Sequence, residues 1–321
     1  MGAYIRRRVL TTIPVMLGVS LMVFLMLHLL PGDPVMMMLT EHRGGSAPTV
    51  TGNITEEMYD NMRHQLGLDR PLPVQFASFL GGVLRGDLGT SFRGGEAVGI
   101  MIQRNLPYTI QLAAASLGVA MILGFVLGII AGVKRGTWID SLTMTIAAAG
   151  VSMPSFWLGI MLLLIFAVHL NLVPAVARSA DLRSLILPAI ALGFGASAII
   201  ARLVRSTLVE ALQQDYVRTA RAKGIRERGV VIRHALKNAM IPVITVVGLQ
   251  FGNLLGGTVV IETVFGRPGI GHITVNSILE RDFPVVQGVV LVSAITYVIA
   301  NFLVDLAYTW VDPRIRFGGG N

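Results

Sequence analysis

Six stretches without a charged side chain constrain this chain more than any other feature of its sequence. A helix needs about 20 mainly apolar residues to cross the hydrocarbon core of a bilayer. The stretches lie between Arg8 and Asp33, Arg104 and Lys134, Asp140 and Arg178, Ser184 and Ala201, Lys237 and Glu262, and Asp282 and Asp305. The residues are 53% hydrophobic and only 14% charged, against roughly 25% charged in soluble domains. The sequence therefore predicts an all-α membrane protein with six transmembrane helices.

The third stretch is longer than one crossing requires and contains two prolines, Pro154 and Pro174. Proline lacks a backbone donor and kinks or ends a helix. We expect one helix from about Asp140 to about Leu170, kinked at Pro154. A re-entrant break at Pro154 is the alternative.

The distribution of lysine and arginine predicts the orientation, because short loops rich in these residues stay in the cytoplasm. With both termini inside, the inner segments hold 16 cations and five acids, and the outer segments hold 10 cations and 12 acids. All three lysines, Lys134, Lys223 and Lys237, then lie inside. Both termini are expected to be cytoplasmic.

These boundaries divide the chain into four parts. Residues 1–31 form a first span, whose apolar run of about 22 residues exceeds that of a cleaved signal peptide. Residues 32–104 form a long outer segment, 105–311 a core of five spans with an inner loop at 205–237, and 312–321 an inner tail. The long connections are where functional contacts are expected.

The inner loop contains a short amphipathic helix. Thr207 and Glu210 fit a capping box at its start, Leu212, Tyr216 and Ala220 recur at helical spacing, and Gly224 is placed for a left-handed C-cap. Such a helix can lie on anionic lipid, dock into a groove of a soluble partner or simply link two spans.

The loop EALQQDYVRTARAKGIRERGVVIRHALKNAMIP, residues 210–242, closely resembles the cytoplasmic loop of the peptide/nickel-type permeases of bacterial ABC importers. Only Ala220 and Gly224 match the family's general signature, Glu-Ala-Ala-x-x-x-Gly. The residues that differ from it resemble the version of the signature found in the peptide branch of the family. The resemblance extends to LLPGDP at 29–34, GDLGTSF at 86–92, SMPSFWLGI at 152–160, VFGRPGIG at 264–271 and DPRIRF at 312–317.

This resemblance implies a type I ABC importer permease fold in the bacterial inner membrane, with residues 32–104 periplasmic. The short inner helix would be the coupling helix that binds an ATPase subunit. Its residues would be Leu212, Tyr216, Arg218, Thr219, Ala220, Arg221, Lys223 and Gly224. The implied partners are a second homologous permease subunit, two ABC ATPase subunits, a periplasmic or lipid-anchored substrate-binding protein and membrane lipid.

No catalytic or cofactor site is expected on this chain. It has no Gly-x-x-x-x-Gly-Lys-Ser/Thr phosphate loop, so ATP and Mg²⁺ would be bound by separate ATPase subunits. Cysteine is absent and the histidines show no metal-ligand spacing, so no metal site is expected. The cations are spread over inner loops, which argues against nucleic-acid binding.

Polar residues within the apolar stretches are candidates for a translocation path. These are Gln250, Asn253 and Asn301, with Asp305 either on the path or at the membrane interface. Gly124, Gly128 and Gly132, and likewise Gly252 and Gly256, recur every four residues and predict close helix packing, with sliding surfaces as the alternative.

The expected function is import of di- or oligopeptides by alternating access, with glutathione, nickel complexes or saccharides as alternative substrates. A more distant alternative is an ATP-independent channel or an intramembrane enzyme, which would not need a capped inner helix.

Overall fold

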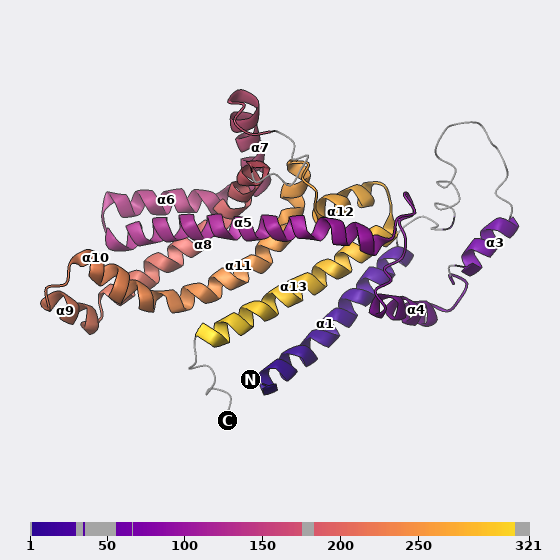
Figure 1. Ribbon diagram of the computed structural model, residues 1–321, viewed down its shortest axis with the longest axis horizontal. Helices are drawn as coiled ribbons and strands as arrows, with labels where there is room; N and C mark the ends of the chain where they lie inside the picture. Colours follow the sequence, from indigo (N-terminus) through magenta and orange to yellow (C-terminus); the bar gives the residue numbers. More distant parts are fainter. Residues whose placement is uncertain (1, 30–34, 36–55, 66, 175–182, 312–321) are drawn as a thin grey trace. The chain divides into compact units, whose positions relative to one another are not determined.

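The computed structural model describes residues 2–29, 35, 56–65, 67–174 and 183–311 (Figure 1). Within these residues the secondary structure is helical, and the one extended pairing is an isolated bridge between Thr90 and Ala97. The predicted all-helical class is confirmed for this part of the chain. The chain divides into two compact units: residues 1–106 with 273–296, and residues 107–272 with 297–321.

The second, larger unit is built around helix α8 (Arg183–Leu212). This helix packs against α6 (Trp138–Ser152), α7 (Ser155–Leu162) and α11 (Leu236–Val264). Its buried face is rich in small residues, including Ala191, Gly193 and Ser197. Small side chains let helix backbones approach closely, which is how helices associate where no water drives them together.

The predicted packing role of the glycine repeat in α5 (Val98–Val133) is confirmed. A Cβ atom at Gly124 would lie 2.7 Å from Ile200, one at Gly128 2.7 Å from the Ala201 carbonyl oxygen, and one at Gly132 3.0 Å from Leu208. In α11, Gly252 packs against the ring of Tyr297 in the same way, whereas a Cβ atom at Gly256 would have no atom of another described residue within 4 Å. The second repeat is therefore a packing site at one glycine only.

The expectation of a single kinked helix from Asp140 to Leu170 is wrong. Helix α6 ends at Ser152, and the segment Ser155–His169 leaves it at an angle of 102°. Met153 is extended (ψ 125°) and precedes Pro154, because the proline ring disfavours helical geometry in the residue before it. After α7 the chain continues as a π-helix, η1 (Leu163–His169).

In the part of the chain that the structure describes, four helices are long and apolar enough to cross a membrane, and the bent pair α6 and α7 adds a fifth if it counts as one crossing. The four are Val98–Val133, Arg183–Leu212, Pro242–Val264 and Phe283–Val304. Helix α1 (Gly2–Leu29) contains a shorter apolar stretch, Leu10–Met26.

The first unit contains α1, α3 (Glu56–Gln65), α4 (Leu72–Leu84) and the beginning of α13 (Phe283–Val311). Buried Asp282 fastens the loop after α4, because its carboxylate accepts hydrogen bonds from the Ser91 hydroxyl and, at 3.0 Å, from the Phe92 N–H. The Gln287 side chain donates to the Val23 carbonyl oxygen at 2.9 Å. The outer segment predicted at 32–104 thus has its own helices and anchors in this unit.

Gly128→Ala tests the packing of α5 on α8. The added methyl group meets backbone and Val204 at 2.7 Å, and overpacking of this kind costs about 1–3 kcal/mol. We expect a lower thermal unfolding midpoint for the full chain in lipid nanodiscs. Gly118→Ala in the same helix, where nothing lies within 4 Å, is the matched control and should leave the midpoint unchanged or raise it; equal midpoints for the two variants would contradict the assigned contact.

Candidate functional site

The loop between α8 and α11 forms the most clearly delimited functional candidate, and its start differs from the expectation. Helix α8 continues through the presumed capping box to Leu212, and the Thr207 hydroxyl donates to the Leu203 carbonyl oxygen one turn back at 2.9 Å. The short helix α9 (Asp215–Ala222) begins after extended Gln214. The capping box prediction is wrong because Thr207 finds a partner inside α8 and is never left at a helix end.

The predicted stop at Gly224 is confirmed. Gly224 has a φ of +75°, its N–H donates to the Arg221 carbonyl oxygen at 2.9 Å, and the Ile225 N–H donates to the Ala220 carbonyl oxygen at 3.3 Å. This pair of bonds is a Schellman motif, in which a left-handed residue turns the chain back over the last helical turn. Glycine adopts this conformation without steric cost.

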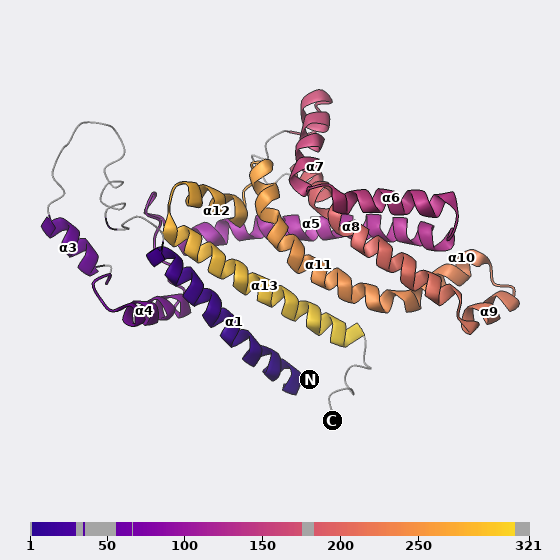
Figure 2. The same ribbon diagram turned by 180° about the vertical axis from the view of Figure 1, so that it is seen from behind.

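The buried face of α9 consists of Val217 and Ala220, which are 0% and 5% exposed. They pack in one cluster with Leu208 and Ala211 near the end of α8. The cluster also includes four residues of the segment that leads into α11 and of its first turn: Val230, Val231, Ala235 and Ala239. Tyr216 is 39% exposed, whereas half-buried Leu212, the last residue of α8, packs against the same cluster as Ala220, so the predicted apolar stripe Leu212, Tyr216, Ala220 is wrong at Tyr216. In Figure 1 and Figure 2, α9 and α10 (Glu227–Gly229) lie together beyond the adjoining ends of α8 and α11.

The opposite face of α9 is exposed and cationic. Arg218, Thr219, Arg221 and Lys223 are all exposed. Arg221 donates to the Glu227 carboxylate at 2.6 Å, which lowers the pKa of Glu227 and raises that of Arg221. Lys223, Arg226 and Arg228 make no ion pair with any residue that the structure describes. The loop therefore presents a cationic surface on one face of α9, and the other face of α9 is buried.

Asp140 and Arg205 brace α6 against α8 near this loop. Arg205 Nε donates to one carboxylate oxygen of Asp140 at 2.6 Å and Nη2 donates to the other at 2.7 Å, while the Gly136 N–H adds a bond of 3.0 Å. Asp140 is 5% exposed, and bidentate pairing to arginine is a strong, directional contact. Sequence reasoning counted both residues as inner charges and missed their pairing, since 65 residues separate them.

The three predicted path residues fall on α11 and α13. Gln250 is buried and its side-chain oxygen accepts a hydrogen bond from Asn253 Nδ2 at 2.9 Å, whereas Asn253 is exposed. The side-chain oxygen of Asn301 lies 3.3 Å from the position that a Cβ atom of Gly252 would occupy. Two of the three therefore contact each other, and Asn301 lies beside Gly252. The side chain of Asp305 lies outside the described residues.

A second polar cluster, around Glu262 at the end of α11, was not predicted as a site. Glu262 is 0% exposed, and one carboxylate oxygen accepts from the Thr109 hydroxyl at 2.6 Å. The other accepts from the backbone N–H groups of Gly271 and His272 at 2.8 and 3.2 Å. These N–H groups begin α12 (Ile270–Leu279), so the carboxylate satisfies helix donors that have no partner within the helix.

The loop before α12 is wrapped tightly around this carboxylate. A Cβ atom at Gly269 would lie 2.2 Å from the Glu262 carboxyl carbon, and one at Gly271 would lie 2.4 Å from the Val259 Cα atom. Arg267, 1% exposed, donates through Nη2 to the Gln111 side-chain oxygen at 2.7 Å. The available signal was a glutamate at the end of an apolar run, followed within ten residues by an arginine and three glycines. The sequence does not show that these glycines enclose the carboxylate.

Glu262→Gln is expected to destabilise the chain, because one acceptor oxygen becomes an NH2 group that faces hydrogen-bond donors, and a buried polar group left without a partner costs about 1–3 kcal/mol. Gly269→Ala should act in the same direction by steric conflict. Thermal unfolding in nanodiscs measures both, and Gly256→Ala, with open space around it, is the control. A wild-type midpoint for both variants would show that the loop does not depend on this carboxylate.

Comparison with known proteins identifies the family. The profile of the binding-protein-dependent transport system inner membrane component matches residues 124–317, and its N-terminal counterpart matches residues 1–113. The glutathione transport system permease protein GsiC of Pectobacterium atrosepticum is 43% identical over 98% of this chain and 99% of its own length. GsiC of Escherichia coli K12 is 41% identical over the same shares.

Solved structures agree at the level of the fold. An inward-facing MetNI methionine ABC transporter chain aligns with a TM-score of 0.55 at 20% identity, over 66% of this chain and 96% of its own. A chain of an amino acid ABC transporter aligns with a TM-score of 0.51 at 13% identity, over 65% and 92%. The chain therefore belongs to the family of inner membrane components of binding-protein-dependent transport systems, as a multi-pass permease subunit of an ABC importer.

Proposed function

We propose that this chain crosses the inner membrane six times with both termini in the cytoplasm and pairs with a second, homologous permease subunit. The four long apolar helices, the bent pair and the apolar stretch of α1 support six crossings. The concentration of 16 of the 26 cations in the segments then assigned to the inside supports the orientation.

Helix α9 is proposed to be the coupling helix, seated in a cleft of an ATPase subunit. The observation that carries this proposal is that α9 has two unlike faces. Val217 and Ala220 are buried against both α8 and the helices leading into α11, while Arg218, Arg221 and Lys223 remain exposed. A displacement of α9 would therefore be passed to two helices of the core at once, because packed interfaces move as units and do not deform continuously.

ATP and Mg²⁺ are assigned to two separate ATPase subunits, since this chain carries no phosphate-binding loop. A substrate-binding protein outside the membrane is proposed to deliver the substrate. ATP binding would close the ATPase pair, move α9 and shift the spans between inward-open and outward-open states. The chain itself provides the transport pathway and transmits the displacement of α9 to the spans, and it catalyses no reaction.

The proposed substrate is a short peptide. The 41–43% identical relatives are named for glutathione, which is itself a tripeptide, and this supports peptides over the nickel complexes and saccharides considered from the sequence. The family assignment also favours an ATP-driven importer over an ATP-independent channel or an intramembrane enzyme.

Site-directed crosslinking tests the assignment of α9. The chain contains no cysteine, so a cysteine at exposed Ala222 would be the single reactive thiol. We expect it to crosslink to a cysteine in the cleft of the cognate ATPase subunit, with a yield that changes when ATP is added. A cysteine at exposed Glu57 in α3 is the control. A stable membrane protein that gives no crosslink from position 222 would refute the docking proposal.

A second variant pair isolates the helix stop. Gly224→Val places a β-branched residue at a φ of +75° with no neighbouring atom within 4 Å, so the strain is in the backbone alone. Asparagine tolerates this conformation far better. We expect Gly224→Val to abolish transport-linked ATP hydrolysis in proteoliposomes and Gly224→Asn to retain most of it, with equal membrane insertion of both. Equal coupling in the two variants would show that the left-handed stop is not required.

A further inference from the structure

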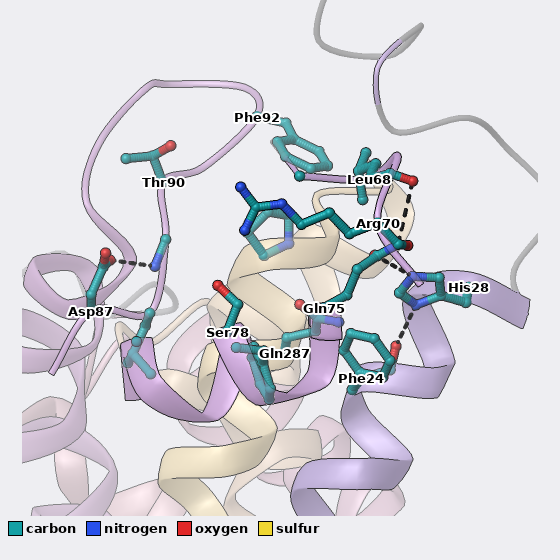
Figure 3. Close-up of a pocket in the computed structure, with 16 residues that line it drawn as sticks. Phe24, His28, Leu68, Arg70, Gln75, Ser78, Asp87, Thr90, Phe92 and Gln287 are labelled. Carbon is teal, nitrogen blue, oxygen red and sulfur yellow. Dashed lines mark hydrogen bonds between the residues drawn. The ribbon is translucent and has the colours of Figure 1, made fainter. Parts of the chain in front are cut away.

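The first unit contains a cavity of about 350 Å³ that the proposed transport mechanism does not use. Its wall is formed by α1, the loop between α3 and α4, α4, the loop after α4 and the beginning of α13 (Figure 3). The volume lies at the lower end of the range of about 300–1,000 Å³ found for small-molecule sites. A cavity of this size suits a small ligand and not a folded partner.

One wall of the cavity is held by hydrogen bonds to Gln75. Its Nε2 donates to the carbonyl oxygens of Arg70 at 2.7 Å and Leu68 at 3.3 Å, which directs Oε1 toward His28 Nε2 at 3.1 Å. The other ring nitrogen of His28 lies 3.0 Å from the Phe24 carbonyl oxygen. These bonds join α1, α4 and the loop between α3 and α4, so the wall exists before any ligand enters.

The opposite wall is also held in place by hydrogen bonds. The Gly89 N–H donates to one carboxylate oxygen of Asp87 at 2.9 Å, and the loop continues to Ser91 and Phe92, which are anchored on buried Asp282. The second oxygen of Asp87 makes no hydrogen bond with a described residue. It is free to accept one from a ligand.

Arg70 supplies the complementary charge. Its side chain extends from the loop between α3 and α4 over the cavity, between Phe92 and Ser78 (Figure 3). Its guanidinium forms no hydrogen bond or ion pair with any residue that the structure describes. Figure 3 shows Asp87 on the far side of the cavity from the Arg70 backbone. The rings of Phe24, Phe79 and Phe92 add apolar surface around these two charges.

We propose that this cavity binds a short peptide in its zwitterionic form, with the carboxylate on Arg70 and the ammonium group near Asp87. The planar guanidinium matches a carboxylate in two parallel hydrogen bonds. The aromatic rings would contact the peptide side chains, which would make the site tolerant of sequence. The choice of a peptide rests on the proposed function; the choice of a zwitterion rests on the two charges alone.

Equilibrium binding of radiolabelled dialanine to the full chain in phosphatidylcholine nanodiscs tests the proposal. Arg70→Gln should weaken binding about tenfold or more, because it removes a charge-assisted hydrogen-bond pair. Arg63→Gln, an exposed arginine of α3 outside the cavity, is the matched control and should leave binding unchanged.

Modified ligands assign the two ends. C-terminally amidated dialanine should bind more weakly than dialanine and be insensitive to Arg70→Gln, and N-acetylated dialanine should be insensitive to Asp87→Asn. The proposal would be overturned if dialanine did not bind, or if Arg70→Gln and Arg63→Gln had equal effects. It would also be overturned if phosphoethanolamine displaced dialanine at a lower concentration than unlabelled dialanine does, and this result would assign the cavity to a lipid headgroup. The crosslink from position 222 does not depend on this cavity, so the two proposals fail separately.

Discussion

The close approach of α8 to its neighbours is the contact on which the larger unit depends. Helices in a bilayer gain little by hiding apolar side chains from one another, since lipid is equally apolar, and they associate through dense packing. Here α8 contributes a small-residue face, and glycines complete it: the backbone of Gly193 lies so near Ser116 of α5 that a Cβ atom would be 2.4 Å from the Ser116 carbonyl oxygen. Gly150 of α6 approaches the Phe194 carbonyl oxygen with a corresponding distance of 2.7 Å. Larger side chains at these positions would push the helices apart.

Two buried carboxyl groups of this unit, those of Asp140 and Glu262, join helices to one another. Asp140 and Arg205 join the beginning of α6 to α8, and Glu262 joins the end of α11 to the first turn of α12 and to Thr109 of α5. A buried carboxyl group is costly unless it is hydrogen-bonded. Each of these two carboxyl groups accepts three hydrogen bonds, with at least one on each oxygen. Apolar packing therefore holds the middle of the helices together, and directional polar bonds hold their ends.

This division bears on how motion could pass through the molecule. Helix α9 is attached by Val217 and Ala220 to the cluster that includes the last turn of α8 and the residues entering α11. Its own end is defined by the two hydrogen bonds around Gly224. In the proposed function, this attachment passes a displacement of α9 to the adjoining ends of α8 and α11. Arg218 and Arg221 on the exposed face of α9 pair with Asp215 and Glu227, while Lys223 beside its end makes no ion pair with a described residue.

The sequence by itself determined the helical class, the apolar stretches, the cationic loop between α8 and α11 and the left-handed stop at Gly224, because each of these depends on residues close together in the chain. Only the tertiary structure decided where α8 ends and α9 begins, since Thr207 bonds within a helix that packing extends to Leu212. It also decided that Val217, and not Tyr216, faces the core, and that the chain turns by 102° near Pro154. The pairing of Asp140 with Arg205, the enclosure of Glu262 and the cavity between Arg70 and Asp87 join residues distant in sequence. Their partners are chosen by helix packing, which local patterns do not encode.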